Sequence, residues 1–101
     1  MVMKKHRIVW DKNAVNYLRG AIEFIRKDSP QNAEKVKRQI KDSVAALADH
    51  PEKHPIDKYR SNNDGSFRAF ELYRFRIAYF VSSSEIRIIR IRHTSQEPLS
   101  Y

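Results

Sequence analysis

The sequence predicts an α+β fold, with an antiparallel two-helix hairpin packed on a mainly antiparallel four-stranded sheet. Apolar residues recur at helical spacing over residues 12–49 and then follow strand-like runs over residues 67–92. A short strand-like segment at 6–10 precedes the helices. Helices on one face of the sheet satisfy this order of strand, helix, helix and three strands. The length suits one domain with one core, so residues 1–101 are expected to form a single domain.

The first helix is predicted from about residue 12 to 28, with Asp11 as its N-cap candidate. Ser29-Pro30 predicts the start of the second helix, because Ser can cap free amides and Pro is tolerated at the first helical position. The second apolar stripe extends to about Asp49. Since the connection between the helices is very short, they should pack as an antiparallel hairpin.

Residues 50–66 hold two His-Pro pairs and an Asn-Asn-Asp-Gly-Ser cluster, which is typical of a loop. Three strands are predicted after it, over 67–72, 74–81 and 85–92, with a hairpin-length break of three serines between the last two. Combining both periodicities, we expect the following residues to be largely buried: Trp10, Leu18, Ile22, Ile25, Val36, Ile40, Leu47, Ile77, Tyr79, Ile89 and Ile91.

Arginines alternate with apolar residues in the last two strands. Because successive side chains point to opposite faces, alternation predicts that one uncovered face carries Arg74, Arg76, Arg90 and Arg92, together with Phe80. The last strand is irregular, since Ile86 and Ile88 alternate onto this arginine side. Like charges repel, so an acidic partner is the simplest explanation of the cluster, and a solvated face is the alternative.

The whole chain is basic, with 20 Lys and Arg against 12 Asp and Glu and a net charge of +8. Such an excess attracts nucleic acid, ribosomes, anionic membrane surfaces or acidic proteins, although a basic domain without such a partner is the alternative. The absence of cysteine excludes disulfides and a Cys nucleophile. We see no signal peptide and no run near the roughly 20 apolar residues that span a bilayer, so a cytoplasmic protein without membrane contact is expected.

Four segments resemble the RelE/ParE toxin superfamily in order and spacing. They are 10–14 with the following Tyr17-Leu18, 29–33, the strand Phe75-Arg76-Ile77-Ala78-Tyr79, and the closing run 89–93. The resemblance implies a growth-inhibiting, plasmid-stabilising toxin of a type II toxin–antitoxin pair. It further implies a cognate antitoxin, expected to be acidic, that wraps the toxin in a hetero-oligomer. RelE-like members cut mRNA on the ribosome, whereas ParE-like members poison DNA gyrase without a nuclease role.

A metal-independent ribonuclease needs a base, a cation that steadies the phosphorane and an acid for the leaving oxygen. Arg76 matches the family's strand arginine and would clamp the phosphate, with Arg68 as a helper. His93 lies where RelE-like nucleases place a basic or His residue, and an imidazole suits proton transfer near neutrality. Tyr101 ends the sequence much as some members end in a functional Tyr. Glu71 departs from the family pattern and is either a base or a salt-bridge partner.

The structural alternatives are that Arg76 pairs with Glu71, that His93 caps the last strand, and that Tyr101 frays. Strict alternation also places His93 on the face opposite the arginines. The surface expected to bind nucleic acid or antitoxin comprises Arg74, Arg90, Arg92 and Phe80.

No cofactor is expected. His50 and His54 have a spacing that can bind metal on a helix, but intervening prolines break a helix there, so no metal site is predicted. The favoured function is a ribosome-dependent mRNA endonuclease, and the alternative is a gyrase inhibitor that acts by binding. A third hypothesis is a nucleic-acid-binding or structural domain that has lost toxicity.

Overall fold

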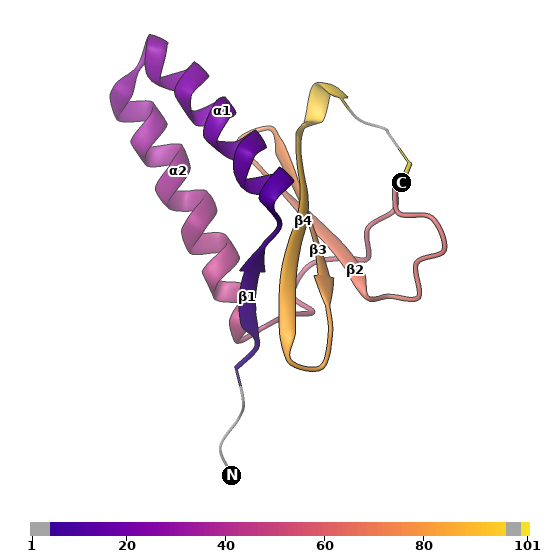
Figure 1. Cartoon of the computed structure of the whole chain (residues 1–101). Coiled ribbons are helices and arrows are strands. Elements are labelled where there is room, and N and C mark those ends of the chain that lie inside the picture. Colours follow the sequence, from indigo (N-terminus) through magenta and orange to yellow (C-terminus); the bar gives the residue numbers. More distant parts are fainter. Residues whose placement is uncertain (1–4, 97–99) are drawn as a thin grey trace.

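The computed structural model describes residues 5–96 and 100–101. Figure 1 shows the two helices lying together on one side of a twisted sheet. In chain order the helices and strands are β1 (Arg7–Trp10), α1 (Lys12–Asp28), α2 (Pro30–Ala45), β2 (Phe67–Leu72), β3 (Phe75–Val81) and β4 (Glu85–His93). Short 3-10 helices follow α2 and β4, at η1 (Ala46–Ala48) and η2 (Thr94–Gln96). The predicted α+β architecture is confirmed.

The helix boundaries follow from local capping. The Asp11 side chain accepts a hydrogen bond of 2.9 Å from the Asn13 amide and caps α1. The Ser29 hydroxyl accepts one of 3.1 Å from the Asn32 amide, and Pro30 opens α2 as predicted. The regular helix ends at Ala45, earlier than the predicted Asp49, because the chain tightens into η1.

The sheet has the order β1-β4-β3-β2, so β3 and β4 are central and β1 and β2 form the edges. The pairs β2–β3 and β3–β4 are antiparallel and joined by short turns. β1 pairs with β4 in parallel, with Ile8 opposite Ile86. This parallel pair is possible because the helices and two strands separate its members in the chain.

A β-bulge in β4 explains the irregular pattern that the sequence shows there. Ala78 pairs with Arg90, but the next residue of β3, Tyr79, pairs with Ile88, which leaves Ile89 as an extra residue. The bulge reverses the alternation, so Ile86 and Ile88 are fully buried on the helix side. The prediction that Ile89 belongs to the core is wrong, since Ile89 is half-buried at the bulge.

The core lies between the hairpin and the sheet. Of the predicted core residues, Leu18, Ile22, Val36, Ile40, Leu47, Ile77, Tyr79 and Ile91 are buried. Trp10 and Ile25 pack against the core but are only half-buried, which corrects the expectation for both. Phe70 and Phe75 are additional buried residues from β2 and β3.

Arg74 lies in the turn between β2 and β3 and not in a strand. Tyr73 and Arg74 have positive φ angles of 52° and 65°, which is the geometry of a tight two-residue hairpin turn. The prediction that Arg74 shares the uncovered face with Arg76 is therefore wrong. The strand register places Arg76 opposite Arg92, Ala78 opposite Arg90 and Phe80 opposite Arg87, so these residues share the face away from the helices.

Candidate functional site

A buried carboxylate, Asp57, lies against the face of the sheet that the helices leave uncovered. The loop between α2 and β2 carries it there, held by a 2.8 Å hydrogen bond from the Asp57 amide to the Phe67 carbonyl. The Asp57 residue is only 1% exposed. Its carboxylate accepts hydrogen bonds from Arg76 at 2.9 Å, from the Tyr59 amide at 3.1 Å and from the Tyr101 hydroxyl. This loop and the last residue therefore cover part of the face that the sequence predicted to be open.

Arg76 is compensated and covered in this arrangement. Its guanidinium binds Asp57 and also donates to Glu71 at 3.0 Å, while its side chain is only 11% exposed. The ring of Tyr59 lies 4.7 Å from the guanidinium carbon. Burial by itself would lower the pKa of Arg76, but the hydrogen bonds to the two carboxylates raise it above its ordinary value. The cation thus has two anionic partners and little access to a ligand.

The same contacts shift the pKa values of Asp57 and Tyr101. Burial would raise the pKa of Asp57, but hydrogen bonds from Tyr101, Arg76 and Tyr59 outweigh it and hold the pKa below its ordinary value. The pKa of Tyr101 is raised well above its ordinary value, first by burial and then by its hydrogen bond to the Asp57 carboxylate. At neutral pH the network therefore contains an ionised aspartate, a charged arginine and a neutral tyrosine.

The other two predicted catalytic residues lie on the opposite side of the sheet. His93 pairs with Phe75, and their rings meet edge to face at 5.7 Å between centroids. Its Nδ1 lies 2.8 Å from the Ser95 hydroxyl, and its amide donates to the Tyr17 hydroxyl of α1. Arg68 is in register with the buried Tyr79 and donates to the His54 carbonyl at 2.8 Å. Arg76, Glu71 and Tyr101 belong to one network with Asp57, in which Arg76 and Tyr101 bind Asp57 and Glu71 binds Arg76. His93 and Arg68 are not part of it.

The remaining predicted surface residues lie either on the same face as Asp57 or in the turn before β3. Arg90 and Arg92 share the Asp57 face, and the Arg90 guanidinium lies 4.2 Å from the centre of the Tyr101 ring. Phe80 is not an isolated aromatic, since it packs on Phe67 with 4.9 Å between ring centroids. Arg74 is exposed in the turn that precedes β3.

Sequence reasoning missed Asp57, Tyr59 and Arg60. They lie in an irregular loop, where no periodicity reports which side chains point inward. The one available signal was the arginine on a central strand, because a buried cation requires a carboxylate partner from somewhere in the chain.

Comparison with known protein families decides the class of this chain. Residues 8–98 match the family described as ParE toxin of the type II toxin-antitoxin system, parDE. The chain belongs to the ParE toxin family. A comparison with curated proteins gave no match. As a ParE-family toxin, the protein is the toxin component of a type II pair, and an antitoxin is its partner.

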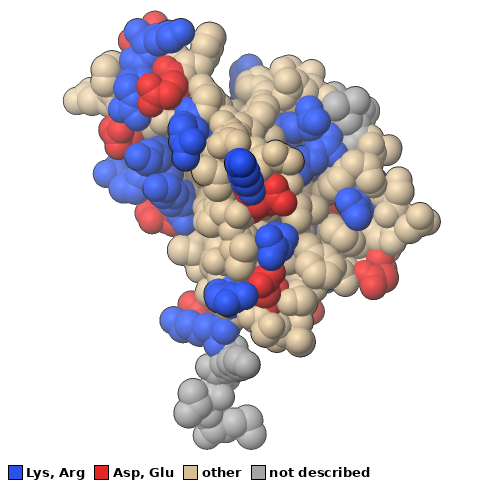
Figure 2. All heavy atoms as spheres, viewed as in Figure 1, with Lys and Arg blue, Asp and Glu red and all other residues tan. Residues whose placement is uncertain are grey.

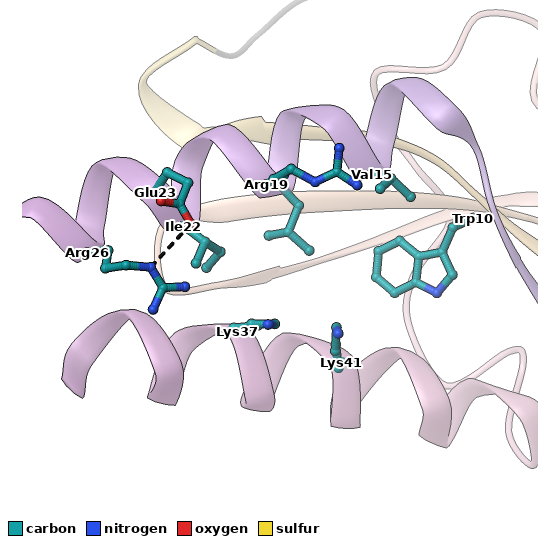
Figure 3. A pocket seen from close by; sticks show the side chains of 9 residues that line it. Trp10, Val15, Arg19, Ile22, Glu23, Arg26, Lys37 and Lys41 are labelled. Carbon is teal, nitrogen blue, oxygen red and sulfur yellow. Dashed lines mark hydrogen bonds and ion pairs between the residues drawn. The ribbon is translucent and has the colours of Figure 1, made fainter. Parts of the chain in front are cut away.

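The ParE-family toxin presents a second surface on its helical hairpin. A groove of about 470 Å³ runs between α1 and α2, with an apolar floor of Trp10, Leu18 and Ile22. Figure 3 shows cationic side chains extending over it from both helices, namely Arg19, Arg26, Lys37 and Lys41. Arg26 is bound to Glu23 and Glu34, so part of the rim charge is compensated. Figure 2 shows basic side chains gathered over this hairpin.

The described part of the ParE-family toxin contains no group of three or more His, Cys, Asp or Glu residues placed to hold a metal ion. None of its described helices is long and apolar enough to cross a membrane.

Proposed function

We propose that this ParE-family toxin inhibits DNA gyrase by binding to it, and that it does not cut RNA. The family resemblance allows either mRNA cleavage or gyrase poisoning, so the choice depends on the site. The observation that carries the proposal is the state of Arg76. A phosphate clamp needs an accessible and uncompensated cation, whereas Arg76 is covered and bound by Asp57 and Glu71.

Proton transfer in a nuclease imposes a second requirement. The base, the acid and the cation must reach the same phosphodiester within hydrogen-bonding distance. His93 belongs to the helix-facing side of β4, against Phe75 and Tyr17, while Arg76 belongs to the other side. The neutral Tyr101 donates its proton to a hydrogen bond with Asp57, and its raised pKa makes it a poor base at neutral pH. These positions favour a surface that binds a protein over one that cleaves a phosphodiester.

The test compares two assays at the same toxin concentrations. We expect the purified toxin to inhibit supercoiling by gyrase and to leave cell-free translation unchanged. The matched variant is His93→Ala, checked for folding by circular dichroism. If His93 were catalytic, this variant would lose roughly 10²–10⁴-fold of the nuclease activity. We expect His93→Ala to inhibit gyrase as the wild type does. Arrested translation with cleaved mRNA and unaffected supercoiling would show that the nuclease function is the correct one.

We also propose that an acidic, amphipathic segment of the antitoxin occupies the groove between α1 and α2. Its apolar residues would cover Trp10, Leu18 and Ile22, and its carboxylates would meet the cationic rim. Charge complementarity of this kind mainly accelerates association and makes it dependent on salt.

The prediction is that Lys37→Glu combined with Lys41→Glu slows association with the antitoxin and weakens its salt dependence. The control is Lys35→Glu with Arg38→Glu, which changes the same charge on the same helix outside the groove. Surface plasmon resonance at low and high salt measures both. Equal association rates for the two double variants would exclude the groove as the docking surface.

A further inference from the structure

A second groove lies where β4, the loop after Asp57 and the start of α1 meet. It encloses about 510 Å³, and its lining includes Arg60, Arg90, Arg92 and Tyr101, with Tyr17 on the α1 side. None of the described residues that line it is acidic. A group of basic side chains is visible toward the C-terminal end of the molecule in Figure 2, away from the helical hairpin.

Stacking on aromatic rings holds two of these arginines in place. The Arg60 guanidinium lies 4.0 Å from the centre of the Phe67 ring and 5.0 Å from that of Tyr101. The Arg90 guanidinium lies 4.2 Å from the centre of the same Tyr101 ring. Because the N–H donors of a guanidinium lie in its own plane, stacking on Phe67 fixes Arg60 without occupying these donors. The groove is therefore organised before any ligand arrives.

Among the described residues, the two acids on this face do not pair with Arg60 or Arg92. Asp57 and Glu71 both bind Arg76, the cross-strand neighbour of Arg92. Arg60 and Arg92 make no ion pair within residues 5–96 and 100–101. Half-buried cations that lie close together repel one another, and an anion with several acceptor oxygens would offset that repulsion.

We propose that the groove formed by Arg60, Arg90 and Arg92 binds the phosphodiester backbone of DNA. Arginine forks match the paired oxygens of a phosphate, and the groove uses only arginine for its cations. The helical groove differs, since its apolar floor and lysines suit an amphipathic peptide. This inference extends the proposed function, because a gyrase inhibitor that also holds DNA would bind the enzyme while its substrate is engaged.

The experiment measures fluorescence anisotropy of a short labelled DNA duplex over a range of salt concentrations. The groove variants are Arg60→Gln and Arg92→Gln, which lie on different elements, so one remains informative if the other does not fold. Each is expected to weaken DNA binding roughly ten- to a hundredfold and to reduce the salt slope by about 1. Arg74→Gln removes the same charge from an exposed turn outside the groove and should bind as the wild type does.

Wild-type affinity for the duplex in both folded groove variants would overturn the inference. So would an RNA strand of the same sequence that binds more tightly than the duplex. Poly-glutamate serves as a probe for an acidic polypeptide, and groove variants that lose poly-glutamate binding but keep duplex binding would also overturn it. A supercoiling assay on the same proteins separates this inference from the proposed function. If the wild type binds DNA through the groove but leaves gyrase active, only the proposed function fails. If the groove variants inhibit gyrase and bind DNA as the wild type does, only the inference fails.

Discussion

Replacing Asp57 by Asn is expected to destabilise the protein by about 3–5 kcal/mol, because it leaves the cation of Arg76 buried without its main partner. Asn has nearly the same shape, so the loss reports charge and hydrogen bonding and not packing. The total free energy of unfolding of a small domain is about 5–15 kcal/mol, so this loss would be a large part of it. Urea unfolding followed by the fluorescence of Trp10, the single tryptophan, measures it.

Glu71→Gln is the matched control, since it removes a carboxylate from the same arginine. The Glu71 side chain is 53% exposed. An exposed ion pair contributes only about 0–1 kcal/mol, so this variant should be close to the wild type. Equal losses for Glu71→Gln and Asp57→Asn would mean that burial does not control the energetics of the network.

The Asp57 network also predicts how stability depends on pH. Because the folded pKa of Asp57 lies below its ordinary value of 3.8, the stabilisation is fully present above that value. It is lost as the pH falls below 3.8 and through the lowered folded pKa. The difference in unfolding free energy between the wild type and Asp57→Asn should therefore be constant near neutrality and shrink in acid. A difference that grows in acid would contradict the assigned charge state.

Replacing Ile88 by Ala is expected to cost about 2–5 kcal/mol, whereas the same change at its neighbour Ile89 should cost much less. Ile88 is fully buried opposite Tyr79, and its truncation removes apolar contacts and leaves a cavity. Ile89 is the extra residue of the bulge and is half-buried. Since the substitution is identical and the positions adjacent, the comparison isolates the effect of the bulge. Ile77→Ala, in the centre of β3, should fall in the same range as Ile88→Ala.

Chemical denaturation of both β4 variants gives the two free energies directly. Strict alternation along β4 would place Ile89 in the core and Ile88 outside, and it therefore predicts the larger loss of stability for Ile89→Ala. A larger loss at Ile89 than at Ile88 would therefore place the strand in the register that alternation alone implies, and would exclude the bulge.

Local chemistry in the sequence was sufficient for the architecture. The apolar spacing of the hairpin, the caps at Asp11 and Ser29 and the breaks around the strands all act within a few residues of one another. Such features define where elements begin and end, and the order of the elements then limits how they can pack. The fold class and the toxin superfamily were accessible at this level, as was the shared face of Arg76, Arg90 and Arg92.

Tertiary structure alone decided which charges are available on that face. Asp57 and Tyr101 are 44 residues apart in the chain, and nothing in either local pattern indicates that they bond to each other or that Asp57 binds Arg76. The bulge at Ile89 likewise depends on how β4 pairs with β3 and not on its own periodicity. Long-range pairing and burial determine whether an arginine is compensated or open to a ligand. For that reason Arg76, the residue singled out by its motif, belongs to the internal network, while Arg92 beside it remains without an ion-pair partner in the described part of the chain.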